Sequence, residues 1–202
     1  MTIFFYMAFL ASTAFANIEI EDHSLVFESY VLEKQNKILQ ALDRMKKVAA
    51  TESDSYFVHQ RIGQLYISAK DVPKAIAHFQ RASELKPKSL EPWLILAHHH
   101  EKIDEYIKTK LFSGEALLRD PLHKEAGMMY VKACLKLKTY ADGFDHVQIL
   151  LSGFPNDAYF LEQRAFFLAN LGKKAEAKAA LTDLLLVDPD NEFARKFVTK
   201  EQ

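Results

Sequence analysis

The sequence has little of what several classes of protein require. Cys134 is the single cysteine in 202 residues, so the chain cannot form an internal disulfide, and no Cys–Cys or Cys–His spacing indicates a metal site. Glycine and proline number only six each, which disfavours an all-β fold with many tight turns and favours helices. The formal net charge of -1 creates no overall field that would attract nucleic acid or an anionic membrane. The chain remains long enough for a domain with a sizeable core.

Motifs of catalytic and nucleotide-binding sites are also missing. The sequence contains no GxxxxGK[ST], GxGxxG or GxSxG segment, the glycine-rich turns that position phosphates or a nucleophilic serine. His98, His99 and His100 are consecutive, but successive side chains of a helix point about 100° apart, so a regular helix cannot direct all three at one ion. We predict a protein with no catalytic residue, no metal and no cofactor. An enzyme or enzyme accessory that uses these histidines is the alternative.

The first sixteen residues resemble a secretory signal peptide. They carry no charged side chain, Ile3 to Leu10 form an apolar core, and Ala14-Phe15-Ala16 supplies the small residues that signal peptidase recognises. The Lys or Arg that usually precedes the core is missing. The apolar run is too short to span a bilayer, which takes about 20 helical residues. We expect cleavage after Ala16 and a periplasmic or secreted bacterial protein; the alternative is a cytoplasmic protein with an intact N-terminus.

Four of the six prolines are equally spaced along the chain: Pro87, Pro121, Pro155 and Pro189. Their interval, a period of about 34 residues, is typical of solenoid repeats built from helix pairs. If each proline is placed at position 32, the chain divides into four units, 56–89, 90–123, 124–157 and 158–191. Small residues then recur at positions 8, 20 and 27, where two helices would cross closely, among them Gly63, Ala97, Ala165, Ala75, Gly143, Ala177, Ala82 and Ala116.

This pattern resembles the tetratricopeptide repeat, which has an aromatic residue at position 4, Leu-Gly at 7–8, Tyr at 11, Ala at 20 and 27, Phe at 24 and Pro at 32. The first unit matches at Gly63, Tyr66, Ala75, Phe79, Ala82 and Pro87, and the fourth adds Gly172 at the glycine between the two helices. The second and third units match less well. The residues that depart from the pattern are Ser113, Gly143, Cys134 and Arg164. The resemblance covers all four units, from residue 56 to residue 191.

Local signals agree with helix pairs. Ser53-Asp54-Ser55 offers capping oxygens before a helix that begins near Tyr56. Asp71-Val72-Pro73 ends that helix and places proline in the first turn of the next one. Cys134 falls at position 11, a core position, so we expect a buried thiol and no nucleophile. His100 occupies the same position in the second unit and is expected to be buried as well.

The resemblance implies an all-α fold: a right-handed superhelical solenoid of antiparallel helix hairpins. In this family the first helix of each repeat lines a concave groove through positions 2, 5, 9 and 12. Carried onto this chain, these positions hold Phe57, Gln60, Gln64, Ile67, Glu91, Leu94, His98, Glu101, Glu125, Met128, Lys132, Leu135, Tyr159, Glu162, Phe166 and Ala169. We expect all of them except Glu91, Glu125, Tyr159 and Ala169 to contact a partner.

Such a groove suits an extended or helical peptide with hydrophobic anchors. Gln60 and Gln64 stand where the lysine and asparagine of a C-terminal carboxylate clamp would be needed, so no such clamp is expected. We predict a non-catalytic protein- or peptide-binding scaffold that assists a cell-envelope complex; the alternative is a chaperone-like holder for an exported protein. Neither nucleic acid nor a membrane span is expected after signal cleavage.

The flanking segments are predicted to be helical. Residues 17–55 have two interpretations, since 23–50 contains no glycine or proline. In one, 22–55 is a degenerate capping repeat in the same register. In the other, the spacing of Leu25, Leu32 and Leu39 marks a coiled coil that makes the protein oligomeric. Residues 192–202 are predicted to be a short capping helix whose Phe193 and Phe197 cover the last repeat.

Overall fold

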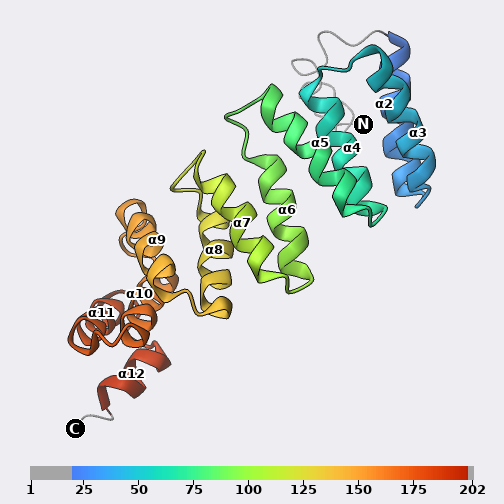
Figure 1. The fold of residues 1–202 in the computed structure, drawn as a ribbon. Helices are drawn as coiled ribbons and strands as arrows, with labels where there is room; N and C mark the ends of the chain where they lie inside the picture. The colour runs from blue at the N-terminus through green and yellow to red at the C-terminus, as the bar shows by residue number, and fades with distance from the viewer. Residues whose placement is uncertain (1–19, 200–202) are drawn as a thin grey trace, which may run out of the picture. The chain divides into compact units, whose positions relative to one another are not determined.

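The computed structural model describes residues 20–199, and within that range it contains helices joined by short turns and no strand (Figure 1). The prediction of an all-α fold built from helix hairpins is confirmed. The helices fall into two compact units, one ending at Pro92 and the other beginning at Trp93. None of the helices between residues 20 and 199 has the length and apolar character needed to cross a bilayer. The predicted signal peptide, residues 1–16, lies outside the described residues.

The first unit consists of two helix hairpins. Its helices are α2 (Ile20–Lys34), α3 (Ile38–Thr51), α4 (Tyr56–Ser68) and α5 (Val72–Leu85). Helix α4 begins as the sequence predicted, because the hydroxyl of Ser55 accepts a hydrogen bond from the backbone N–H of Val58 at 3.5 Å. Asp71 caps α5 in the same way at 3.3 Å, with Pro73 in the first turn.

A buried ion pair joins α2 to α4. Arg61 is 3% exposed, and its Nη1 donates to Oε2 of Glu33 at 2.6 Å. The guanidinium also stacks on the ring of Tyr30, 3.7 Å from its centroid. Because an unpaired buried charge is costly, these contacts of Arg61 favour the observed position of α2 beside α4.

The N-terminal helical segment differs from a single helix over residues 23–50. The chain turns at Gln35-Asn36-Lys37, where Asn36 has a φ of 59°, a left-handed conformation that asparagine tolerates better than most residues. This break separates Leu39 on α3 from Leu25 and Leu32 on α2. A continuous coiled coil through these three leucines is therefore wrong for this chain.

Asn36 is the first of five left-handed residues that follow the repeat interval. The others recur at the same spacing as the prolines, each between the two helices of a hairpin, and the set is Asn36, Lys70, Asp104, Lys138 and Gly172, with φ values of 59°, 62°, 58°, 57° and 79°. The same backbone turn thus recurs in both units. Only in the last hairpin is the left-handed residue a glycine, which adopts this conformation without strain.

The second unit consists of three hairpins and a terminal helix. Its helices are α6 (Glu91–Lys102), α7 (Tyr106–Leu117), α8 (Lys124–Leu137), α9 (Tyr140–Gly153), α10 (Ala158–Asn170), α11 (Lys174–Val187) and α12 (Glu192–Thr199). Aromatic rings fill the space between α6 and α7, where Phe112 stacks on Trp93 and on His100 with centroid distances of 6.2 and 5.3 Å.

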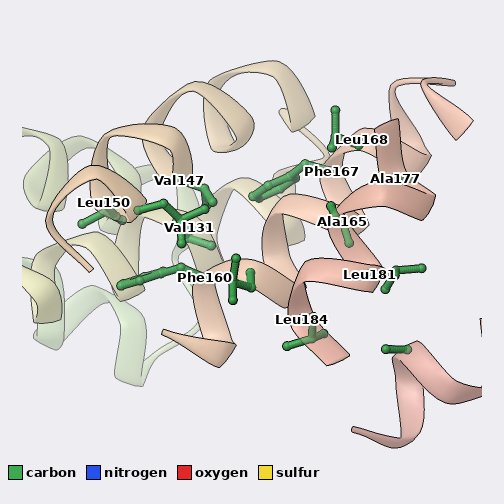
Figure 2. Packing of buried hydrophobic residues seen from close by; sticks show 14 of the residues in the cluster. Val131, Val147, Leu150, Phe160, Ala165, Phe167, Leu168, Ala177, Leu181 and Leu184 are labelled. Carbon is green, nitrogen blue, oxygen red and sulfur yellow. The ribbon is translucent and has the colours of Figure 1, made fainter. Parts of the chain in front are cut away.

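One hydrophobic cluster runs through the C-terminal half of this unit. Figure 2 shows Val131, Val147 and Leu150 of α8 and α9 beside Phe160 and Phe167 of α10. All five side chains are fully buried. In this cluster the hairpin of α8 and α9 buries its apolar face against the hairpin of α10 and α11, as stacked repeats require.

The end of the chain closes this cluster, although not through both predicted phenylalanines. Phe197 of α12 packs against the cluster, and Ala194 is completely buried in it. Phe193 instead is 40% exposed, because a residue adjacent to Ala194 on a helix points to a different side.

Candidate functional site

A groove lies on the second unit, along the first helices of its hairpins. It encloses about 600 Å³ and is lined from α6, α8 and α10 by His98, Glu101, Lys124, Glu125, Met128, Met129, Lys132 and Tyr159. Helix α8 forms the floor, since five of these eight residues belong to it.

The sequence of α8 directs three side chains into the groove. The helix begins after His123, whose Nδ1 accepts a hydrogen bond from the backbone N–H of Ala126 at 3.3 Å. Glu125, Met128 and Lys132 follow at spacings of three and four residues, which places them on one face of a helix. The opposite face buries Val131 and Cys134 in the core. The core-facing residues therefore fix which side of α8 meets the groove.

A histidine–carboxylate hydrogen bond and an ion pair connect α6 to α8 across the groove. Nε2 of His98 lies 2.9 Å from Oε1 of Glu125, and Nζ of Lys132 donates to Oε1 of Glu101 at 2.9 Å. The hydrogen bond to Glu101 raises the pKa of Lys132 above its ordinary value. The groove thus carries both acidic and basic side chains, and its two lysines, Lys124 and Lys132, each face a carboxylate.

The C-terminal wall of the groove comes from the start of α10. Asp157 caps this helix by accepting from the backbone N–H of Phe160 at 3.3 Å, and it also pairs with Nζ of Lys124 at 2.6 Å. Tyr159 lies beside them, half-buried. Burial, and secondarily the charges of Glu101 and nearby carboxylates, raises the pKa of Tyr159 to about 12. Its hydroxyl therefore stays protonated at any physiological pH and can donate a hydrogen bond.

The groove has the properties of a binding surface. The paired charges offer hydrogen bonds in fixed directions, and Met128, 39% exposed, offers a flexible apolar contact at the floor. Within residues 20–199, no group of three or more His, Cys, Asp or Glu side chains could hold a metal ion. The arrangement can hold a peptide that places an apolar side chain against Met128 and polar groups against the ion pairs.

Four of the predicted contact residues line this groove: His98, Glu101, Met128 and Lys132. The others in the second unit lie outside it. Glu162 accepts a hydrogen bond from Asn191 at 3.2 Å, Leu135 packs against the core cluster, Leu94 is half-buried, and Phe166 is partly exposed with its ring edge-on to Tyr140.

The remaining predicted contacts belong to the first unit. They are all half-buried on α4 and do not line the groove: Phe57, Gln60, Gln64 and Ile67. Their role in binding stays a prediction.

The sequence placed Glu125 and Tyr159 on the groove face without including them among the contacts, and it missed Lys124 and Met129 altogether. Lys124 is at position 1, and its place in the groove follows from its pairing with Asp157 at the end of the same repeat. Met129 reaches the groove although it is 3% exposed. A comparison of each position 1 with the residue that caps the following helix pair could have revealed Lys124.

Cys134 and His100, which both occupy position 11 of their units, are buried, as predicted. The thiol of Cys134 is fully buried, and burial raises its pKa, which suppresses the reactive thiolate. His100 is 1% exposed, and its Nδ1 lies 2.8 Å from Oε2 of Glu105. Burial lowers the pKa of His100. Both side chains serve the packing of helix pairs.

Comparison with known proteins adds a repeat match and a fold. Residues 58–89 match the tetratricopeptide repeat model, which agrees with the unit 56–89 predicted from the sequence. No curated protein sequence matches the chain significantly.

Solved structures share the fold at low sequence identity. One is YrrB, described as a TPR protein with an unusual peptide-binding site, with a TM-score of 0.59 and 14% identity over 88% of this chain and 91% of that one. Another is MamA AMB-1, with a TM-score of 0.61 and 16% identity over 89% of this chain and 98% of that one. A further MamA structure has a TM-score of 0.62 and 14% identity over 84% and 92% of the two chains. The predicted class of tetratricopeptide-type helical solenoid is therefore confirmed, and at such identities the likeness concerns the fold alone.

Proposed function

We propose that the protein is a non-catalytic scaffold that binds a protein or peptide segment in the groove of α6, α8 and α10. The observation that carries the proposal is the groove itself, where two lysine–carboxylate pairs surround the partly exposed Met128 on a floor held by a buried core. The peptide-binding site named for YrrB supports it by analogy of fold.

The groove favours a segment with one apolar anchor and polar flanks. The anchor contacts Met128 and the ring of Tyr159. The flanking polar groups accept from Lys132 and donate to Glu125, groups that are already oriented by their partners across the groove. Preorganised partners reduce the entropy lost on binding.

This function is tested by selection and a matched pair of variants. Peptides selected from a random library on the purified protein are measured by isothermal titration calorimetry. Met128→Ser should weaken them about tenfold, because an anchor side chain loses its apolar contact. Ile149→Ser, at 44% exposure on α9, is the control and should leave the affinity unchanged. If the selected peptides bind both variants as tightly as the wild type, the groove is not their site.

We also propose that the protein is exported and assists a cell-envelope complex. The apolar segment 3–10 and the Ala14-Phe15-Ala16 site support this. Cell fractionation combined with N-terminal sequencing tests it: an envelope or secreted protein beginning at Asn17 is expected. An intact Met1 in the cytoplasm would favour a cytoplasmic holder of unfolded or exported chains instead.

A further inference from the structure

Helix α7 carries an apolar seam on its outer face. The seam consists of Ile107, Leu111 and Gly114 of α7 and of its C-cap residue Leu118, whose backbone is still helical. Their spacings of four, three and four residues place them in one line along a helix. The three large side chains are 75%, 56% and 77% exposed. Aligned aliphatic side chains exposed to this degree are typical of an interaction surface.

The equivalent positions of the other hairpins show that the repeat does not require this seam. Where α7 has Ile107, the helices α5, α9 and α11 have, in that order, Pro73, Ala141 and Ala175. Where α7 has Leu111, the same three helices have Ala77, Asp145 and Ala179. At the position of Leu118 they hold Glu84, Ser152 and Leu186. The folding of a hairpin thus tolerates small or charged residues here, and the seam of α7 serves something outside the hairpin.

Gly114 gives a second, independent indication. A Cβ atom at this position would lie 3.5 Å from the ring of Tyr130, an ordinary van der Waals contact, whereas at Gly63, Gly127 and Gly143 it would come within 2.8 Å of a core side chain. Internal packing therefore explains those three glycines but not Gly114. Glycine in a helix interior costs about 0.5–1 kcal/mol relative to alanine.

We propose that α7 is a self-association surface on which a second copy of this chain docks its own α7, antiparallel, about a two-fold axis between Leu111 and Gly114. This axis places Ile107 against the partner's Leu118. It also places Leu111 over the partner's Gly114, where the absent side chain leaves room for it. Large and small residues alternate along one seam, so the seam is complementary to its own inverted copy.

The charges beside the seam are also complementary to themselves. In an antiparallel pair, Lys108 flanks the seam within two residues, about 3 Å along the axis, of the level of the partner's Glu115, and the symmetry repeats the pair. In one chain these groups are held by neighbours, Lys108 by Glu105 at 2.8 Å and Glu115 by Arg119 at 3.1 Å. A contact made by one helix of 12 residues is small, so the dimer is weak.

This surface is separate from the groove, since α7 contributes none of the groove residues. The dimer therefore does not depend on the proposed peptide binding, and either can fail alone.

Sedimentation equilibrium of the purified protein over a range of concentrations tests the dimer. A reversible monomer–dimer equilibrium is expected, with a dissociation constant below about 1 mM, in the range of weak complexes. Leu118→Glu should weaken it about tenfold or more, because a charged side chain would be buried in the seam. Leu186→Glu is the matched control, because Leu186 is also a leucine at the same repeat position and is 79% exposed on α11. This change should leave the equilibrium unchanged. A wild type that stays monomeric overturns the proposal, as does equal weakening by both variants.

Gly114→Ala separates association from folding. It should preserve or raise the melting temperature of the dilute monomer while weakening the dimer. Equal dimer affinity in this variant overturns the placement of Leu111 over Gly114.

Disulfide trapping tests the register. A mixture of Ile107→Cys and Leu118→Cys chains should form a mixed disulfide dimer, whereas Ile107→Cys alone should not, because the length of helix between the two positions separates them by about 16 Å and a disulfide spans less than about 7 Å between Cα atoms. Efficient cross-linking of Ile107→Cys to itself would show parallel pairing and overturn the antiparallel arrangement.

Discussion

Gly63 of α4 lies directly against the ring of Phe79 of α5. A Cβ atom added to Gly63 would be 2.7 Å from Cε1 of Phe79 and within 2.9 Å of two further ring atoms. Phe79 is completely buried, so the ring cannot move out of the way without leaving a cavity. This contact sets how closely α4 and α5 approach each other.

Gly63→Ala is expected to destabilise the protein by about 1–3 kcal/mol, because the added methyl group overpacks the helix crossing. Urea denaturation followed by circular dichroism measures the change. Gly114→Ala in dilute protein is the control, since its methyl group would meet Tyr130 at 3.5 Å and alanine favours helix by about 0.5–1 kcal/mol. Equal destabilisation by both changes would mean that Gly63 is not required for the close approach of α4 and α5.

Lys138→Gly is expected to stabilise the protein. Lys138 follows α8 with a φ of 57°, and the left-handed conformation costs a residue with a Cβ about 1–2 kcal/mol. After the larger entropy loss of glycine is subtracted, a net gain of about 0.5–1 kcal/mol remains. Lys136→Gly, within the last turn of α8, should instead lose about 1 kcal/mol. Thermal melts of the two variants against the wild type distinguish these outcomes; loss of stability in both would contradict the strain at Lys138.

The positions of the helix pairs could be predicted from the sequence because each signal was local. Ser55 caps α4 and Pro73 lies in the first turn of α5, as the sequence indicated, and the helices α5, α9 and α11 end two residues before their prolines. The turn at Asn36 was missed, since neither glycine nor proline marks it. The sequence did contain a signal for this turn: stepping back from Gly172 by the interval between the prolines leads, after four steps, to Asn36.

The groove could be predicted only in part, because its shape depends on contacts between the first helices of successive hairpins. The helix register placed Met128 and Lys132 correctly. The pairing of Lys124 with Asp157 joins the two ends of one repeat and depends on the distance between helices, which the register does not give.

We propose that residues 22–55 are a degenerate repeat, since their two helices and Asn36 continue the interval.

Stability should fall as the pH is lowered from 7.5 to 5.5, in part through His146. Its ring packs on Tyr130 with centroids 4.9 Å apart, and its buried Nε2 has no hydrogen-bond partner within the described residues. Burial lowers the pKa of His146 from the ordinary 6.5, so the unfolded chain binds this proton more readily than the folded one. The resulting contribution is fully present above pH 6.5 and is lost as the pH falls toward the folded pKa.

His146→Phe keeps a ring against Tyr130 and removes the titrating group. Its melting temperature should therefore depend less steeply on pH between 7.5 and 5.5 than that of the wild type. Parallel curves for the two proteins would show that His146 is protonated equally in the folded and unfolded chains.

The Glu101–Lys132 pair across the groove can be measured by exchanging its charges. Lys132→Glu places a carboxylate beside Glu101, and Glu101→Lys places two ammonium groups together, so each single change should destabilise α6 against α8. The double exchange should recover most of the loss. Because the two side chains are 20% and 48% exposed, the coupling energy from a double-mutant cycle is expected to be about 0.2–1 kcal/mol and to shrink in high salt. A coupling of zero at low salt would mean that solvent separates the two charges, and the peptide would then meet a groove whose polar groups are not held in place.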